Sequence, residues 1–149
     1  MPTYKNVAVL GGGSFGTALA QLASRHGQDV RLWMGNETRV CAINDHHRNP
    51  DYLSEFELSD RIIATADLKE AVDGADWIIV AIPSHALRSV LGEMRDFIPT
   101  VPMVLAAKGI ENDTLMTLDE VVCDVLGHGW ESRTLALSGP SFAKEIMEL

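Results

Sequence analysis

A glycine-rich turn near the start of the chain constrains the fold more than any other feature of the sequence. The short apolar run Val7–Leu10 leads into a G-x-G-x-x-G pattern formed by Gly11, Gly13 and Gly16, and a run of small residues typical of a helix follows at once. In such a turn the first glycine permits a tight change of direction. The second lets the backbone approach a pyrophosphate, and the third lets the helix lie close to the sheet. The free N–H groups at the helix start attract phosphates. Glycine-rich turns are common, but a turn placed between a strand and a helix predicts a dinucleotide site.

Length and charge narrow the class of protein further. The 149 residues are enough for one domain with a full core. The formal net charge of −9 argues against nucleic acid or an anionic membrane as a partner. No apolar run approaches the ~20 residues that a membrane span needs, and the first residues do not resemble a signal peptide, so a cytoplasmic location is expected. Cys41 and Cys123 lack the spacing of a metal or disulfide motif, and no metal site is predicted.

Strand and helix patterns alternate along the whole chain. Apolar runs predict six strands, and amphipathic or capped segments predict a helix after each of them. The predicted strands cover residues 7–10, 29–34, 62–65, 77–82, 103–107 and 134–138. The predicted helices cover 14–26, begin near 36, 67 and 84, span 115–125, and open again after 139. This order predicts an α/β, Rossmann-type doubly wound fold, with a mainly parallel sheet and helices on both faces. Trp33 and Trp77 lie in predicted strands and are interpreted as core residues.

The carboxyl ends of the predicted strands gather the candidate functional residues. Lys108 follows a buried strand directly and can project into the crevice where phosphates would lie, although an ordinary solvated lysine fits the same pattern. The segment 139–142 offers N–H groups and a hydroxyl at a helix start, which suits a phosphate or an oxyanion. A simple helix cap explains that segment equally well.

Several motifs, in the same order along the chain, closely resemble the bacterial NAD(P)-dependent glycerol-3-phosphate dehydrogenases. They are Gly11–Ala20, Asn49–Leu53, Pro83–His85, Lys108–Glu111 and Ser138–Glu145. The resemblance spans the chain and implies that residues 1–149 form the NAD(P)-binding domain of a longer protein. A helical substrate domain, which would carry the proton-relay lysine, is then absent, so no catalytic residue is assigned here.

The resemblance also implies the reaction and its residues. NAD(P)H and dihydroxyacetone phosphate would exchange a hydride to give sn-glycerol 3-phosphate for phospholipid synthesis. Ser14, Phe15, Lys108 and Ala143 would contact the cofactor, while Lys108, Gly139 and Ser141 would hold the substrate. A homodimer is one arrangement open to the full-length protein.

The end of the second predicted strand bears on the choice of cofactor. An NAD-specific fold usually has an acidic residue there, but Asn36 stands 20 positions after Gly16, and Glu37 is expected to begin a helix. The family often carries Arg or His where this chain has Gly35, so Gly35 marks a cofactor contact without the usual phosphate partner. Arg39 is a candidate substitute from the first helical turn. We therefore expect both NAD and NADP to bind, with NADPH modestly favoured.

Two other classes of function fit the same domain. One is a sibling reductase acting on another small carbonyl compound, against which the Lys108–Gly109 and Ser138–Ser141 motifs argue. The other is a non-catalytic module that senses NAD(P)H. Joining the chain to a helical substrate domain would separate an enzyme from a sensor.

Overall fold

The computed structural model describes residues 3–139 and 142–149. The strands are β1 (Asn6–Leu10), β2 (Asp29–Trp33), β3 (Ile62–Thr65), β4 (Trp77–Val80), β5 (Met103–Leu105) and β6 (Thr134–Ala136). The helices are α1 (Ser14–Arg25), α2 (Glu37–His46), α3 (Leu68–Val72), α4 (Ser84–Met94), α5 (Leu118–Leu126) and α6 (Ala143–Glu148). The strands form one parallel sheet in the order β3-β2-β1-β4-β5-β6, which confirms the predicted fold class.

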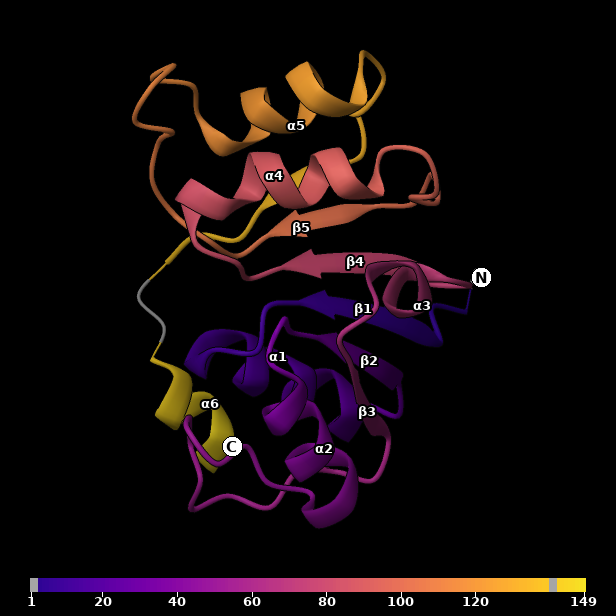
Figure 1. Ribbon diagram of the computed structural model, residues 1–149, viewed down its shortest axis with the longest axis vertical. Helices are drawn as coiled ribbons and strands as arrows, with labels where there is room; N and C mark the ends of the chain where they lie inside the picture. The colour runs from indigo at the N-terminus through magenta and orange to yellow at the C-terminus, as the bar shows by residue number, and fades with distance from the viewer. Residues whose placement is uncertain (1–2, 140–141) are drawn as a thin grey trace.

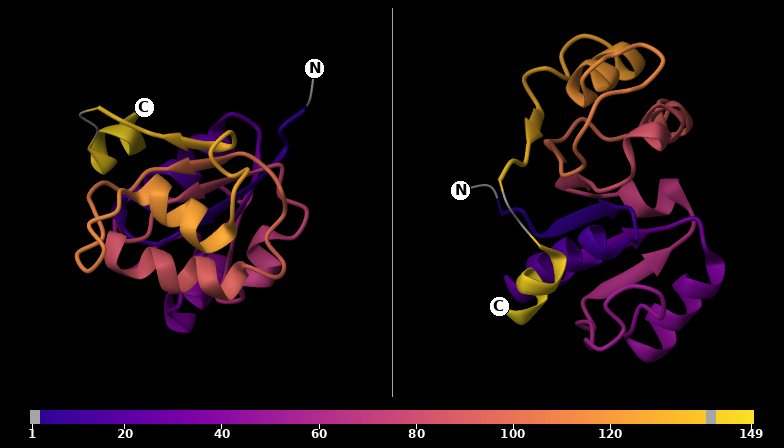
Figure 2. Two further views of the ribbon diagram at one scale, coloured as in Figure 1. Left: turned by 90° about the horizontal axis from the view of Figure 1, so that it is seen from above. Right: turned by 90° about the vertical axis from the view of Figure 1, so that its left-hand side faces the viewer.

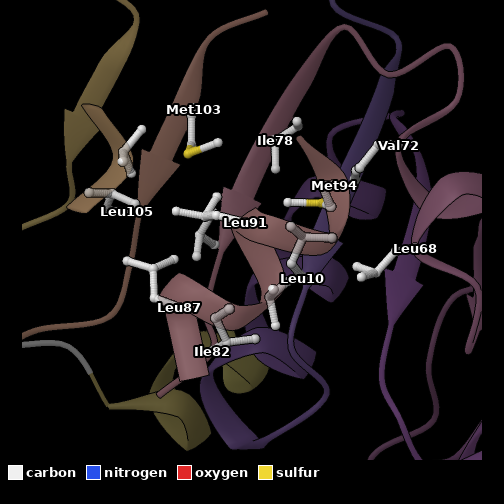
Figure 3. Packing of buried hydrophobic residues seen from close by; sticks show 14 of the residues in the cluster. Leu10, Leu68, Val72, Ile78, Ile82, Leu87, Leu91, Met94, Met103 and Leu105 are labelled. Atoms are coloured by element: carbon white, nitrogen blue, oxygen red, sulfur yellow. The ribbon is translucent and has the colours of Figure 1, made fainter. Parts of the chain in front are cut away.

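The helices divide between the two faces of the sheet (Figure 1). Alternate residues of each strand point to opposite faces, so in β1 Ala8 and Leu10 enter one core while Val7 and Val9 enter the other. The first core packs the sheet against α3, α4 and α5, and Figure 3 shows Leu87, Leu91 and Met94 of α4 lying over the strand side chains. The second core packs it against α1, α2 and α6. Burial on both faces explains why the strands are almost continuously apolar.

Three strands end two residues before the predicted position. After β4, β5 and β6 the next residue still donates its N–H to the last carbonyl of the neighbouring strand, and the chain then leaves the sheet. These bonds run from Ala81 to Leu10, from Ala106 to Val80 and from Leu137 to Leu105, at 2.8, 2.8 and 2.9 Å. Each of these strands ends where its neighbouring strand ends. A run of apolar residues in the sequence does not show where that point lies.

The predicted helix over 115–125 begins three residues late. Leu115 is 70% exposed and has a φ of +59°, so it lies in a turn rather than on the helix. A capping box between Thr117 and Glu120 sets the start of α5 at Leu118. That Thr-x-x-Glu signal was readable in the sequence and is stronger than the apolar spacing of Leu115. The helix ends at Gly127, whose φ of +99° at the C-cap favours glycine.

The edge beyond β5 is thinly covered on the α1 face. Leu135 of β6 is 58% exposed, and an apolar groove of about 410 Å³ runs between α1 and the strands β4 and β5, with Leu137 at its side. The short helix α6 returns to pack beside α1, as the right-hand view of Figure 2 shows, and leaves this groove open. In the described residues no helix is long and apolar enough to cross a membrane.

Candidate functional site

The glycine turn between β1 and α1 is packed too closely for any side chain at two of its three glycines. Gly11 has a φ of +118°, and a Cβ there would lie 2.5 Å from the carbonyl oxygen of Ala81. A Cβ at Gly16 would lie 1.8 Å from the carbonyl oxygen of Gly11. Both clashes are with backbone atoms, so neither can be relieved by turning a side chain. The roles predicted for Gly11, in the turn, and for Gly16, in helix packing, are therefore supported by this geometry.

Gly13 differs from the other two because the space beside it is open. A Cβ built there meets no atom within 4 Å, and Gly13 is the N-cap of α1 with no side chain bonded to the helix start. The first N–H groups of an α-helix have no partner within the helix, and here they face no capping side chain. This open cradle in front of a helix N-terminus fits the pyrophosphate of a dinucleotide.

A cavity of about 590 Å³ lies at the carboxyl ends of the strands, in front of this cradle. Its volume is in the range of ligand and cofactor pockets. Six of the predicted site residues line it, namely Gly11, Gly13, Ser14, Phe15, Gly35 and Lys108. A second hollow of about 580 Å³ lies at the amino ends of the strands, around Asp29 and Arg61. Ligands of open parallel sheets bind at the carboxyl ends of the strands, so the first cavity is the candidate site.

Lys108 joins the ends of two strands at the rim of this cavity. Its exposed ammonium Nζ donates to the carbonyl oxygen of Gly139 at 2.8 Å. An ammonium has three donors, so two remain for a ligand. Gly109 follows with a φ of +122°, and a Cβ there would lie 3.7 Å from Ser84 Oγ. The structure thus brings together Lys108 and Gly139, two residues predicted to hold the substrate.

An ionic network holds the loop that carries Lys108. Arg88 of α4 donates from Nε and Nη2 to the largely buried carboxylate of Glu111 at 2.9 to 3.1 Å, and from Nη1 to Asp124 at 2.6 Å. Thr114 Oγ1 donates to Glu111 at 2.6 Å. These donors, Arg88 first and then Thr114, lower the pKa of Glu111 below its ordinary value. The network fixes the turn after β5 to both neighbouring helices.

A buried asparagine holds the other rim of the cavity. Asn49 is fully buried, and its Nδ2 donates to the carbonyl oxygen of Gly12 and to Thr17 Oγ1, both at 3.0 Å. The polar loop 48–60 therefore folds back onto the glycine turn, and it brings Tyr52 to the cavity wall. The polar composition of residues 48–60 predicted only a loop. The resemblance of Asn49–Leu53 to the family was the sequence signal that singled out this loop.

Arg39 and Trp33 also line the cavity. Arg39, proposed from the sequence as a substitute phosphate partner, lines the cavity from the first turn of α2. Trp33 is partly buried and packs against the core as predicted, but it also lines the cavity, and its Nε1 donates to the Ala66 carbonyl at 3.1 Å. Trp77 packs in the second core.

Gly16, Gly139 and Ala143 are predicted site residues that do not line this cavity. Gly16 lies beneath the turn, where it packs against Gly11. Ala143 begins α6, which packs on α1, so its contact with a cofactor stays a prediction. Ser141 lies outside the described residues. Within 3–139 and 142–149, no three His, Cys, Asp or Glu side chains gather in a way that would hold a metal ion.

Known proteins with similar sequences include bacterial glycerol-3-phosphate dehydrogenases. A glycerol-3-phosphate dehydrogenase [NAD(P)+] of Myxococcus xanthus is 45% identical over 140 residues, which make up 93% of this chain and 42% of that protein. The protein of the same name from Leptospira biflexa is 42% identical over 143 residues, covering 95% of this chain and 43% of that protein. The chain thus spans about two fifths of the length of the curated relatives it matches.

The solved structures agree with the sequence relatives. The crystal structure of glycerol-3-phosphate dehydrogenase from Coxiella burnetii superposes with a TM-score of 0.88 at 32% identity, over 98% of this chain and 44% of that one. A family model described as the NAD-dependent glycerol-3-phosphate dehydrogenase N-terminus matches residues 6–149. The chain belongs to the NAD-dependent glycerol-3-phosphate dehydrogenase family and corresponds to the N-terminal part of its members.

Proposed function

We propose that this chain is the NAD(P)-binding half of an enzyme that interconverts dihydroxyacetone phosphate and sn-glycerol 3-phosphate. The observation that carries the proposal is the open cradle at Gly13, which shares one cavity with Lys108. A phosphate-binding helix start and a fixed ammonium on opposite rims suit a dinucleotide and a small anionic substrate that must meet. The names of relatives that are 42 and 45% identical support the choice of substrate.

Each residue then has a definite task. Gly13 leaves room for the pyrophosphate, and the N–H groups of Ser14 and Phe15 at the start of α1 donate to it. Gly35 leaves the end of β2 open to the adenosine half, and Ala143 completes the cofactor contacts. Bound NAD(P)H supplies the hydride.

The substrate side rests on a smaller set of groups. The Lys108 ammonium orients the substrate by its phosphate or carbonyl oxygen, together with Gly139 and Ser141. The proton at the substrate oxygen is assigned to a lysine of the helical domain that follows in the family. By this proposal the chain binds and orients, and the following domain completes the chemistry.

Titration of NADH and NADPH into the chain by calorimetry tests the binding half of the proposal. We expect both to bind, with NADPH modestly favoured. Gly13→Ala should weaken NADH binding by about tenfold or more, because the methyl group fills the cradle, while the thermal midpoint stays unchanged. Gly92→Ala is the matched control, since it adds the same methyl group in open space on the exposed face of α4. Failure of the unaltered chain to bind either cofactor would refute the proposal.

A second experiment separates an enzyme from a cofactor sensor and from a sibling reductase. The chain alone should not oxidise NADH with dihydroxyacetone phosphate, whereas the chain joined to its helical domain should. Activity only with another carbonyl compound would favour a sibling reductase, and no activity in either form would favour a sensor. A cytoplasmic location, a role in phospholipid synthesis, a full-length homodimer and the lack of a nucleic-acid partner remain predictions of this proposal.

A further inference from the structure

One side chain at the adenosine end of the cavity is held by three different partners. Arg39 Nε lies 3.3 Å from Asp51 Oδ2, and its Nη1 donates to the Gly12 carbonyl oxygen at 3.4 Å. The guanidinium carbon lies 5.3 Å from the centre of the Tyr52 ring. The Arg39 side chain is only 21% exposed, so the guanidinium has a defined position at the cavity wall.

The loop that carries two of these partners is anchored independently of Arg39. Asn49, which is buried against the glycine turn, accepts from the Asp51 backbone N–H at 3.2 Å. Asp51 is therefore placed beside Arg39 by the fold of the loop. Its carboxylate is 58% exposed and does not line the cavity, whereas Arg39 does.

The end of β2 offers no other charge to a cofactor. In folds of this type the adenosine ribose lies at the end of the second strand, where an acid selects NAD and a nearby arginine accommodates the 2′-phosphate of NADP. Here Gly35 has no side chain, and the Asn36 side chain is used to accept from the Arg39 N–H at 3.0 Å. Among the described residues that line the cavity, Arg39 and Lys108 are the only charged ones, and Lys108 lies on the opposite rim.

We propose that Asp51 sets the cofactor selectivity of this site by competing with a 2′-phosphate for Arg39. With NADPH the guanidinium donates to the phosphate, and the Asp51 charge opposes that phosphate. With NADH the carboxylate remains the ion-pair partner of Arg39. The pair thereby accepts both cofactors and keeps the preference for NADPH small.

The strengths of the competing interactions fit this role. A partly exposed ion pair contributes little, so a phosphate can draw the guanidinium from it. Arginine and phosphate form charge-assisted hydrogen bonds of greater strength. The remaining Asp51 charge acts over a short distance on a phosphate of the same sign, and salt weakens the effect.

The test measures the dissociation constants of NADH and NADPH for the unaltered chain, for two single variants at Asp51 and Arg39, and for the double variant. It rests on the proposed function because the cavity must hold NAD(P). Asp51→Asn should raise the preference for NADPH by about threefold to tenfold at low salt, mainly through tighter NADPH binding. Arg39→Gln should lower that preference by about tenfold. In the double variant Asp51→Asn should have a smaller effect than in the unaltered chain, because the competition for Arg39 is gone and only the direct repulsion between the Asp51 charge and the phosphate is relieved.

The control is Asp29→Asn, which removes the same charge from an ion pair with Arg61 at 2.8 Å. This pair lies at the amino ends of the strands, away from the cavity. Its cofactor preference should match that of the unaltered chain. If Asp51→Asn changed both dissociation constants equally, or left their ratio unchanged, Asp51 would be structural and the inference would be wrong. If NADH failed to bind the unaltered chain, the proposed function itself would fail.

Discussion

The two rims of the cavity are held in place by different forces. The glycine rim, made of residues 11–17 with Asn49, is held by backbone packing and by neutral, buried hydrogen bonds. The lysine rim, made of residues 106–117, is held by the ionic network of Arg88, Glu111 and Asp124, whose side chains are 38, 11 and 47% exposed. Both rims rise from the same edge of the same sheet.

The two rims therefore tolerate different changes. Close backbone packing leaves no freedom to adjust, so a single added methyl group is costly on the glycine rim. Ion pairs that reach solvent respond to pH and salt, so the lysine rim depends on conditions. We expect the glycine rim to be preformed and the lysine rim to respond to pH and salt.

The largest expected effect is on the glycine rim. Gly16→Ala places a Cβ 1.8 Å from the Gly11 carbonyl oxygen, so α1 must move away from the turn. We expect a loss of about 3 kcal/mol or more in the free energy of unfolding, measured by urea denaturation. Gly92→Ala, in open space, should be neutral or slightly stabilising. Equal stability of the two variants would contradict the steric account.

The buried amide on the same rim should have the next largest effect. Asn49→Ala leaves the Gly12 carbonyl without one of its donors and should cost about 1–3 kcal/mol of stability. It should also weaken NADH binding, because the turn loses its support. Asn44→Ala breaks a similar pair of bonds to Ala64, at 3.0 and 2.8 Å, away from the cavity. That variant should lose stability and keep its NADH affinity.

On the lysine rim the expected effect is on the reaction and leaves stability unchanged. In the chain joined to a helical domain of the family, Lys108→Ala removes the hydrogen bond that we propose to the charged substrate, worth about 1.5–3 kcal/mol, or roughly ten- to a hundredfold in kcat/KM. Lys69→Ala, at the start of α3, should change kcat/KM little. Near-normal kcat/KM in Lys108→Ala would leave Lys108 as a solvated lysine.

The smallest expected effect is the response of the lysine rim to acid. The pKa of Glu111 is lowered in the folded chain, so its stabilisation is present above the unfolded pKa of about 4.3 and is lost as pH falls through the folded value. Urea midpoints measured from pH 6 downward should therefore fall less steeply in Glu111→Gln than in the unaltered chain. Glu131, whose pKa is lowered to about 2 by backbone N–H groups and His128, contributes the same slope to both proteins. Parallel slopes would show that Arg88 does not stabilise the charged form of Glu111.

Local patterns were enough to predict the strands, most helices and the glycine turn. Alternation, helical spacing and caps such as Asn36 and Asp67 are encoded within a few residues, and in the structure both side chains accept from backbone N–H groups of the helix that follows. The steric demands on Gly11 and Gly16 are local for the same reason. The late start of α5 was also local, since Thr117 and Glu120 mark it.

Other features depended on contacts between residues far apart in the chain. The ends of β4, β5 and β6 are set by neighbouring strands. Asn49 meets Gly12 across 37 positions, and that contact brings Asp51 and Tyr52 to Arg39. Helical and strand periodicities carry no information about such pairs, because they report which face of an element is buried and not which loop will cover it. The sequence alone therefore predicted the glycine turn that forms the cofactor cradle. The positions of the charged groups around it are decided only by the tertiary structure.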